Sequence, residues 1–475
     1  MKFGTSGLRG LSSDLKGEAS YRYAAAFGHY LLQSGKAKRG GSILLGRDLR
    51  DSSPEIMANC ATALVELGFD VLDCGTVPTP TLALYGLETD CPSLMITGSH
   101  IPADRNGIKF YRADGEIDKE DEVAISNIAA SLNIAKAREN TPLLPNRTSE
   151  CTALFMARNR TLLPADALLG LKVGVYQHST VARDMLVEIL THFGAEVLPF
   201  GRSETFIPVD TEAVSAETLN KLKLWTAEHE LDAIVSADGD GDRPLVADEA
   251  GNVIRGDLLG LIAAQFLDAA WIVTPVTSNS AIEVAGEFQV LRTRVGSPYV
   301  IAGMNEAVSG GEARVVGFEA NGGLLTANDL TINGQILKAL PTRDCFLPIL
   351  AILRQAHLKR QPLSRIAASY ELPVAAADRL ENIPVDSGAA FMAHLRAGPE
   401  ELSEFLAPIG EVAATSDIDG LRVKLKDGRI IHFRPSGNAP EMRCYVEAPD
   451  ADSADALSQA GLKRVREWLE ACPVT

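Results

Sequence analysis

Apolar runs that alternate with amphipathic stretches recur three times along the chain. Each copy contains an apolar run, a helical stretch and a second apolar run, and the copies begin at residues 43–45, 173–175 and 271–273. In the first two copies Gly68 or Gly194 separates the helical stretch from the second run, whereas the third copy has a shorter helical stretch near 281–285. Strand, helix and strand in this order is typical of a βαβ unit. The pattern therefore predicts three related α/β domains with mixed sheets.

A further apolar run in each copy ends abruptly in small and polar residues. The residues that follow these runs are 97–100, 238–242 and 317–323. In open α/β sheets, binding sites lie at the carboxyl ends of the strands. Because related domains would present these three loops from equivalent positions, we expect them to form one composite site in a central cleft.

The chain from about residue 370 has a different pattern. Residues 421–425 and 430–433 alternate between apolar and polar around Asp427 and Gly428, a hairpin turn signal, and a helical stretch near 453–472 follows. This region predicts a C-terminal α+β domain. We place the domains at residues 1–147, 148–254, 255–366 and 367–475, with linkers near 140–150 and 358–364.

Length and charge agree with a multidomain protein that acts on a small molecule. A chain of 475 residues is long enough for three or four domains. The net charge of −17 disfavours nucleic acid and anionic membranes as partners, although a local arginine cluster can still bind a phosphorylated small molecule. Seven cysteines without a CxxC pair, no signal-peptide pattern and no membrane-length apolar run lead us to expect a cytoplasmic location.

The acidic loop gives the most specific chemical signal. Asp238, Asp240 and Asp242 alternate with glycines, and three carboxylates so close repel one another unless a cation lies among them. Oxygen ligands select Mg²⁺ or Ca²⁺. An EF-hand calcium loop needs glycine at its sixth position, where this chain has Arg243, and the flanking segments read as strands. We expect a Mg²⁺ site with Arg243 beside a phosphoryl group; the alternative is a solvated acidic turn.

The loop after the first domain's apolar run contains a candidate nucleophile. Ser99 lies beside Gly98 and His100, and small neighbours allow a phosphate to approach the backbone N–H groups. Lys109 follows on the next predicted strand, where it could neutralise charge or move a proton. An ordinary turn is the alternative reading of this tripeptide.

Two further loops suit a phosphorylated sugar. Glu319 and Asn321 lie among glycines and could accept and donate hydrogen bonds to neighbouring hydroxyls. The other loop offers a guanidinium, a hydroxyl and a glycine turn, which together could bind phosphate. Its candidate residues are Arg434, Ser436, Gly437, Asn438 and Arg443. Without the other loops, each could equally be a structural turn.

Taken together, these loops resemble the α-D-phosphohexomutase family, the phosphoglucomutases and phosphomannomutases. The resemblance covers essentially the whole chain, in the right order and spacing. The matching segments are 3–10, 46–48, 97–102, 238–243 and 434–438.

The resemblance implies a role for each loop, in domains that would carry phosphoserine, metal, sugar and phosphate in chain order. Ser99 would carry the phosphoryl group and, with Asp238, Asp240 and Asp242, bind Mg²⁺. Acid–base residues and residues around the transferred group would be His100, Lys109, Arg9 and Arg243. Substrate-binding residues would be Glu319, Asn321, Arg434, Ser436, Gly437, Asn438 and Arg443. A hexose 1,6-bisphosphate would be the intermediate and activator, and the protein a monomer or weak homodimer.

The sequence departs from the family pattern at four positions. Gly98 replaces the usual alanine and Ile101 the usual asparagine of the serine loop. In the sugar loop Asn321 replaces serine and Gly323 replaces histidine. We expect mannose phosphate as the substrate, with glucose phosphate and then glucosamine phosphate as alternatives. A metal-dependent sugar phosphatase and a catalytically inactive phosphosugar-binding protein are the alternatives from other classes.

Overall fold

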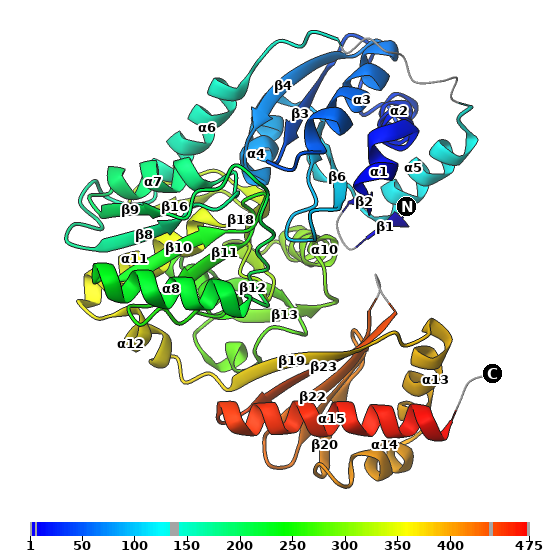
Figure 1. The fold of residues 1–475 in the computed structure, drawn as a ribbon, viewed down its shortest axis with the longest axis vertical. Helices are drawn as coiled ribbons and strands as arrows, with labels where there is room; N and C mark the ends of the chain where they lie inside the picture. Colours follow the sequence, from blue (N-terminus) through cyan, green and yellow to red (C-terminus); the bar gives the residue numbers. More distant parts are fainter. Residues whose placement is uncertain (1, 5–6, 134–141, 437–439, 473–475) are drawn as a thin grey trace.

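The computed structural model describes residues 2–4, 7–133, 142–436 and 440–472. Its elements form four sheet-containing domains, with the C-terminal domain below the other three in Figure 1. This arrangement confirms the expected fold of three α/β domains and one α+β domain.

The first sheet has the order β1-β2-β6-β5-β3-β4, and β7 pairs with β6. Its strands are β1 (Lys2–Phe3), β2 (Leu8–Leu11), β3 (Ser42–Arg47), β4 (Asp70–Thr76), β5 (Ser93–Ile96), β6 (Arg105–Arg112) and β7 (Gly115–Glu116). Its helices are α1 (Ser12–Asp14), the π-helical turn η1 (Leu15–Ala19), α2 (Ser20–Gln33), α3 (Ser53–Glu66), α4 (Thr79–Thr89) and α5 (Lys119–Ser131). Residues along β3 alternate between the two faces, so Ile43 and Leu45 pack with α2, α3 and α5 while Leu44 packs with α4.

The second sheet has the order β11-β10-β8-β9. Its elements are α6 (Thr148–Arg160), β8 (Lys172–Tyr176), α7 (Arg183–His192), β9 (Glu196–Phe200), α8 (Ala216–His229), β10 (Ala233–Ala237) and β11 (Pro244–Ala247).

The third sheet has the order β13-β12-β14-β15-β18, beside a two-stranded sheet of β16 and β17. Its elements are α9 (Gly256–Phe266), β12 (Trp271–Pro275), the 3₁₀ helix η2 (Ser280–Val284), β13 (Gln289–Thr293), α10 (Ser297–Ser309), β14 (Val315–Phe318), β15 (Leu324–Thr326), β16 (Leu330–Ile332), β17 (Gln335–Leu337), β18 (Leu340–Asp344), α11 (Phe346–Lys359) and α12 (Leu363–Ala368). The short helix expected near 281–285 is thus a single 3₁₀ segment.

The three sheets share one four-stranded unit. In spatial order the units are β4-β3-β5-β6, β9-β8-β10-β11 and β13-β12-β14-β15, each with two parallel pairings followed by one antiparallel pairing. The predicted repeat is therefore a repeat of topology. The loop between the third and fourth strands of each unit holds Ser99, the three aspartates or Glu319, so equivalent loops carry the predicted chemistry.

The C-terminal domain has an antiparallel sheet of order β19-β23-β22-β21-β20. Its elements are β19 (Val374–Glu381), α13 (Val385–Leu395), α14 (Pro399–Leu406), β20 (Val412–Ser416), β21 (Leu421–Leu425), β22 (Ile430–Pro435), β23 (Glu441–Ala448) and α15 (Ala451–Ala471). The β21–β22 hairpin and the last helix lie where the sequence predicts them, and α15 crosses one face of the sheet in Figure 1.

One hydrophobic cluster contains residues of the first three domains, which also have further clusters of their own, and the C-terminal domain has a separate cluster. One cluster runs from Leu44 to Ile366, whereas the C-terminal sheet has a cluster of its own, from Phe391 to Val465. The segment 358–364, expected to be a linker, instead joins α11 to α12, and Leu363 is buried in the large cluster. The boundary expected at 366/367 falls inside α12, and the last sheet begins at Val374.

Within the described residues, the helices are all too short or too polar to cross a membrane.

Candidate active site

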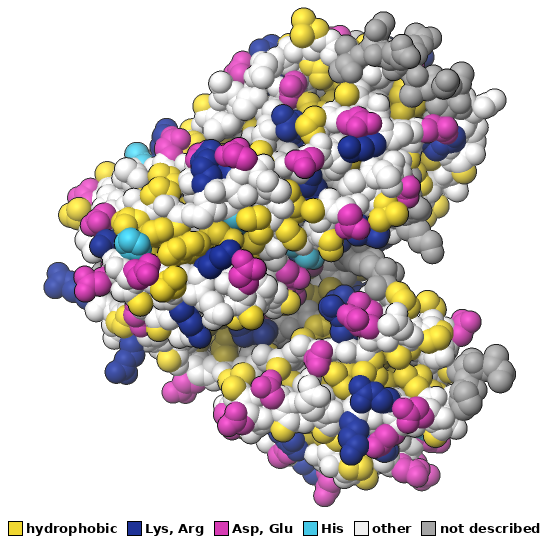
Figure 2. All heavy atoms as spheres, viewed as in Figure 1, with side chains coloured by type: hydrophobic (Ala, Val, Ile, Leu, Met, Phe, Trp, Pro, Cys, Tyr) yellow, Lys and Arg dark blue, Asp and Glu magenta, His cyan; other side chains and the backbone are white. Residues whose placement is uncertain are grey.

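A cleft of about 1480 Å³ lies between the C-terminal domain and the other three. Figure 2 shows the molecule hollowed at this place. All four domains line the cleft with residues predicted from the sequence. These are Arg9, His100, Arg243, Glu319, Asn321, Arg434, Ser436 and Arg443. The structure thus brings the four predicted loops to one cavity.

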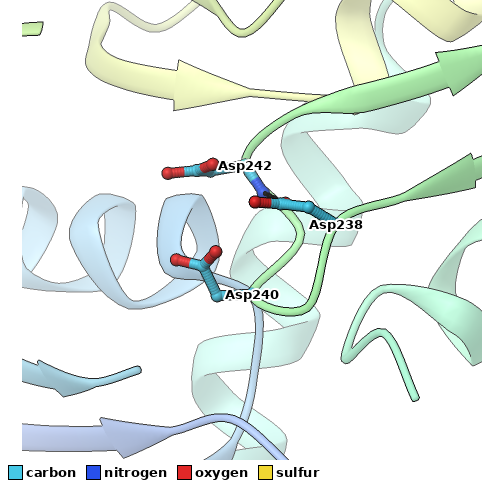
Figure 3. A group of neighbouring side chains, drawn as sticks. All are labelled: Asp238, Asp240 and Asp242. Carbon is cyan, nitrogen blue, oxygen red and sulfur yellow. Dashed lines mark hydrogen bonds between the residues drawn. The ribbon is translucent and has the colours of Figure 1, made fainter. Parts of the chain in front are cut away.

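The three aspartates turn inward from the loop between β10 and β11 (Figure 3). Asp238, Asp240 and Asp242 are fully buried, and one carboxylate oxygen of each lies within 4.8 Å of the others. The loop closes on itself because Asp238 Oδ1 accepts the backbone N–H groups of Asp242 and Arg243. Gly241 has φ of +68° and packs against Pro78, so a glycine is required at this turn.

Two oxygens of this cluster fit a bound cation. Asp240 Oδ1 and Asp242 Oδ1 are buried and have no hydrogen-bond partner among the described residues. Buried carboxylate oxygens are costly unless paired, and a hard divalent cation is the partner that oxygen ligands prefer. The donor set therefore fits Mg²⁺.

Ser99 lies against the acidic loop. Its Oγ donates a hydrogen bond of 2.5 Å to Asp238 Oδ2, and its side chain lies 3.3 Å from His100 Nδ1. The residue has φ of +53°, a left-handed conformation that is strained for serine. Thr97 stabilises this turn, because its Oγ1 accepts the Ser99 backbone N–H at 2.8 Å. The serine predicted as nucleophile is thus held in direct contact with the predicted metal loop.

Arg50, which was not predicted from the sequence, holds the loop that contains Ser99 in place. Its guanidinium pairs with Asp48 and donates to the backbone carbonyls of the loop residues Ser99, Ile101, Pro102 and Arg105. It also lies 3.8 Å above the centre of the Phe206 ring in the second domain. A Cβ on Gly98 would lie 2.8 Å from the guanidinium carbon, so the loop is glycine here because Arg50 occupies the space.

Cations from two domains neutralise the aspartates. Lys109 Nζ donates to Asp240 Oδ2 and Asp242 Oδ2, each at 2.6 Å. Arg343, at the end of β18, contacts Asp242 Oδ2 through Nε at 3.1 Å and binds Glu319 Oε2 at 2.7 Å. Arg343 was not predicted from the sequence. The unusual glycine at position 323 was a sign that a buried side chain packs there, and the structure shows that this side chain is Arg343.

These charges shift the pKa values of the site in opposite directions. Burial and the neighbouring Asp240 and Asp242 raise the pKa of Asp238 well above its ordinary value. Burial opposes the charge of Asp242, but Arg343 and Lys109 lower its pKa. Burial also opposes the charge of Lys109, and the same carboxylates nevertheless raise its pKa.

The remaining cations of the cleft lower the pKa of two predicted residues. Burial and the charges of Arg243 and Arg343 lower the pKa of Arg9 to about 10. Burial, Arg243 and Arg9 together lower the pKa of His100 far below its ordinary value, which holds the imidazole neutral.

The sugar loop is folded by its own side chains. Asn321 Oδ1 accepts the backbone N–H of Gly323 at 3.0 Å, and Gly322 has φ of +81°. Glu319 and Asn321 are both nearly buried at the cleft wall. The loop therefore presents its carboxylate from a fixed turn.

The predicted phosphate loop follows β22. Arg434 Nε forms an ion pair of 2.9 Å with Asp419, whose Oδ2 also accepts the Val295 backbone N–H from the third domain. Ser436 and Arg443 line the same wall, and Arg443 contacts Glu441 at 3.3 Å. Gly437 and Asn438, predicted for this loop, lie outside the described residues.

Family comparison matches all four domains of one family in chain order. Phosphoglucomutase/phosphomannomutase alpha/beta/alpha domains I, II and III match residues 1–135, 155–251 and 255–372, and the family's C-terminal domain matches residues 380–461. Together the matches cover most of the chain, and the chain belongs to the phosphoglucomutase/phosphomannomutase family of phosphohexomutases.

Curated relatives agree over nearly the full length. A phosphomannomutase of Sinorhizobium fredii is 55% identical over 97% of this chain and 98% of its own. A phosphomannomutase of Salmonella muenchen is 39% identical over 99% of this chain and 96% of its own. Among solved structures, a phosphoglucomutase/phosphomannomutase family protein from Burkholderia thailandensis has the same fold, with a TM-score of 0.75 at 20% identity, over 98% of this chain and 97% of that one.

Replacing Gly98 with Ala should destabilise the first domain by about 1–3 kcal/mol, because the new methyl group would collide with the Arg50 guanidinium. Urea unfolding measures the loss. Gly388→Ala is the matched control, since its Cβ would meet only Met442 Cε at an ordinary 3.6 Å. Equal unfolding midpoints for the two variants would contradict the packing of Arg50 on Gly98.

Proposed function

We propose that this enzyme is a phosphomannomutase, which interconverts mannose 6-phosphate and mannose 1-phosphate through a phosphoserine. The observation that carries the proposal is the 2.5 Å contact of Ser99 Oγ with Asp238. Their neighbours His100 and Arg243 line the same cleft as a separate cluster of phosphate-binding candidates around Arg434. The 55% identity with a phosphomannomutase supports mannose as the sugar.

The first half-reaction transfers a phosphoryl group from phosphorylated Ser99 to the free hydroxyl of the sugar monophosphate. The bond between phosphorus and the Ser99 oxygen breaks, and a bond from phosphorus to the sugar oxygen forms. The sugar hydroxyl loses its proton, and the Ser99 oxygen gains one. His100 and Lys109 are the residues we assign to this proton movement, because His100 Nδ1 lies 3.3 Å from Ser99 Oγ and Lys109 lies beside the aspartates.

The second half-reaction reverses these roles at the other end of the sugar. The product of the first step is a hexose 1,6-bisphosphate, which reorients so that its second phosphate faces Ser99. That phosphoryl group returns to Ser99, and the sugar leaves with its phosphate at the other position. A single nucleophile can move phosphate between two sugar oxygens only if both visit it in turn, which is why we propose the bisphosphate as intermediate and activator.

The acidic loop is the proposed Mg²⁺ site. Asp238, Asp240 and Asp242 would hold the ion together with an oxygen of the phosphorylated Ser99. When bound, Mg²⁺ supplies positive charge that stabilises the transferring phosphoryl group. Arg9 and Arg243 line the cleft near these aspartates and are the proposed contacts to that group.

The other end of the cleft is the proposed site for the rest of the substrate. Glu319 and Asn321 would bind sugar hydroxyls in either orientation. The phosphate that is not reacting would lie in the C-terminal loop. Its proposed ligands are Arg434, Ser436, Gly437, Asn438 and Arg443. We further propose a cytoplasmic protein that is a monomer or weak homodimer.

Ser99→Ala should abolish turnover, because it removes the hydroxyl that donates to the Asp238 carboxylate, the group proposed to carry the phosphoryl group between the half-reactions. Labelled phosphate on wild-type Ser99 should pass in a single turnover first to the bisphosphate and then to the monophosphate product. Ser131→Ala, an exposed serine, is the control and should retain full activity. Label found only as inorganic phosphate would support a phosphatase instead, and a panel of mannose, glucose and glucosamine phosphates tests the sugar.

EDTA should silence the enzyme and added Mg²⁺ should restore it, because two buried carboxylate oxygens have no hydrogen-bond partner in the described protein. Asp240→Asn should weaken Mg²⁺ binding at least about tenfold in calorimetry, since it removes one charged ligand. Asp70→Asn, at an exposed position, is the control. Full activity in metal-free buffer would contradict the metal site.

Arg434→Ala should raise KM for both mannose phosphates by about 10- to 150-fold, because a charge-assisted contact to phosphate contributes about 1.5–3 kcal/mol. Initial-rate kinetics in both directions measure the change. Lys426→Ala removes an exposed cation from the same domain and should change neither KM. An effect on one isomer alone would indicate two separate phosphate sites.

A further inference from the structure

Arg343 is a buried cation of the cleft that no matched motif of the sequence contains. It lies at the end of β18, is 3% exposed and lines the cavity with Arg9 and Arg243. Its guanidinium spans two loops, because it contacts Asp242 Oδ2 through Nε at 3.1 Å and through a terminal nitrogen at 2.9 Å. The other terminal nitrogen donates to Glu319 Oε2 at 2.7 Å.

The sugar loop has the shape that this arginine requires. A Cβ on Gly323 would lie 2.8 Å from both Cγ and Cδ of Arg343 and 2.9 Å from its Cβ. Three close approaches to the stem of one side chain leave no room for any other residue at position 323. The glycine that departs from the family pattern is therefore matched to the arginine that packs on it.

Arg343 contacts one carboxylate oxygen of Asp242 and one of Glu319, and it leaves the second oxygen of each without a contact to it. Asp242 Oδ2 is shared by Arg343 and Lys109, while Asp242 Oδ1 has no hydrogen-bond partner in the described part of the chain and lies 3.8 Å from Arg243 Nε. Glu319 is tethered through Oε2. A planar guanidinium can fix two carboxylates at once in a way that a lysine ammonium cannot.

We propose that Arg343 is a positioning residue that joins the sugar loop to the metal loop: it aims Glu319 at the sugar hydroxyls and offsets the negative charge of Asp242. The inference rests on the proposed function for the role of Glu319. It goes beyond that function in coupling sugar binding to metal binding through one side chain. The charge balance predicts that Mg²⁺ binds more weakly with Arg343 present than without it, because like charges repel across this short distance.

Arg343→Met and Arg343→Lys separate the charge from the bridge. Arg343→Met keeps an unbranched apolar stem and removes the charged head, so Mg²⁺ alone should bind about tenfold more tightly in calorimetry without sugar. Arg343→Lys keeps the charge but loses the planar bridge, so its Mg²⁺ affinity should stay within about twofold of wild type. Both variants should raise KM for mannose 1-phosphate about tenfold or more. Arg365→Met, an exposed arginine on α12, is the matched control and should change neither value.

A residue that only fills space would lower the melting temperature and leave Mg²⁺ affinity and KM unchanged, and that result would overturn the proposal. Weaker Mg²⁺ binding in Arg343→Met would overturn its charge-balancing part. If Arg343→Met fails to fold, Arg343→Lys decides the positioning role through KM alone. If wild type is inactive on every phosphosugar tested, the proposed function fails, while the Mg²⁺ comparison still tests Arg343.

A pair of substitutions tests the match between the two positions. Gly323→His alone should lose activity at least about tenfold, because its side chain would collide with the stem of Arg343. Adding Arg343→Gly should restore the melting temperature toward that of Arg343→Gly alone, since it removes all three atoms that would lie within 3 Å of a Cβ at position 323. A double variant no more stable than Gly323→His would show that the two side chains do not compete for one volume.

Discussion

The mutual repulsion of three buried carboxylates on one loop is the constraint on which the rest of the active site depends. Asp238, Asp240 and Asp242 are each fully buried, and burial makes their charges costly unless each is paired. The first domain supplies Ser99, Thr79 and Lys109, whose side chains donate to Asp238 and Asp240. The third domain supplies Arg343 to Asp242. The first and third domains must therefore pack closely against the second, and one hydrophobic cluster does contain residues of all three.

The C-terminal domain is bound differently, by polar contacts at the rim of the cleft. Glu447 accepts the backbone N–H of Ser280 at 3.0 Å, Asn279 donates to the carbonyl of Pro373, and Asp419 connects Val295 to Arg434. The hydrophobic cluster of this domain is separate from those of the other three. Polar contacts exchange readily with water, so they can break and re-form far more easily than a shared core. Such contacts suit the reorientation of the proposed bisphosphate, and the segment 369–373 joins α12 to β19 ahead of this domain. The segment 358–364, expected to be a linker, is held by packing instead, because Leu363 is buried in the large cluster.

The sequence was sufficient to predict the fold class and the loops, because both depend on local patterns. The apolar runs and glycines identified β3, β8 and β12, and the abrupt polar endings identified the loops of Ser99, Asp238 and Glu319. Arg50 and Arg343 were missed because their roles depend on contacts over long sequence separations. Arg50 reaches Ser99 and Phe206, and Arg343 reaches Asp242 about a hundred residues away. An arginine at a strand end gives no local sign that it will be buried. The prediction of a linker at 358–364 was wrong for a similar reason. This polar stretch is the short turn between the packed helices α11 and α12.

The two glycines that depart from the family pattern have one physical explanation. Gly98 and Gly323 lie in different domains, yet each lacks a side chain where a buried arginine occupies the space, Arg50 in one case and Arg343 in the other. In both cases the arginine fixes a loop of the active site, through four backbone carbonyls for the serine loop and through Glu319 for the sugar loop. A guanidinium is large, planar and always charged. It can therefore pack against the loop only where the loop residue has no side chain of its own. At both positions, therefore, the loop residue lacks a side chain, and an arginine from a neighbouring strand or turn fills that space and holds the loop in place.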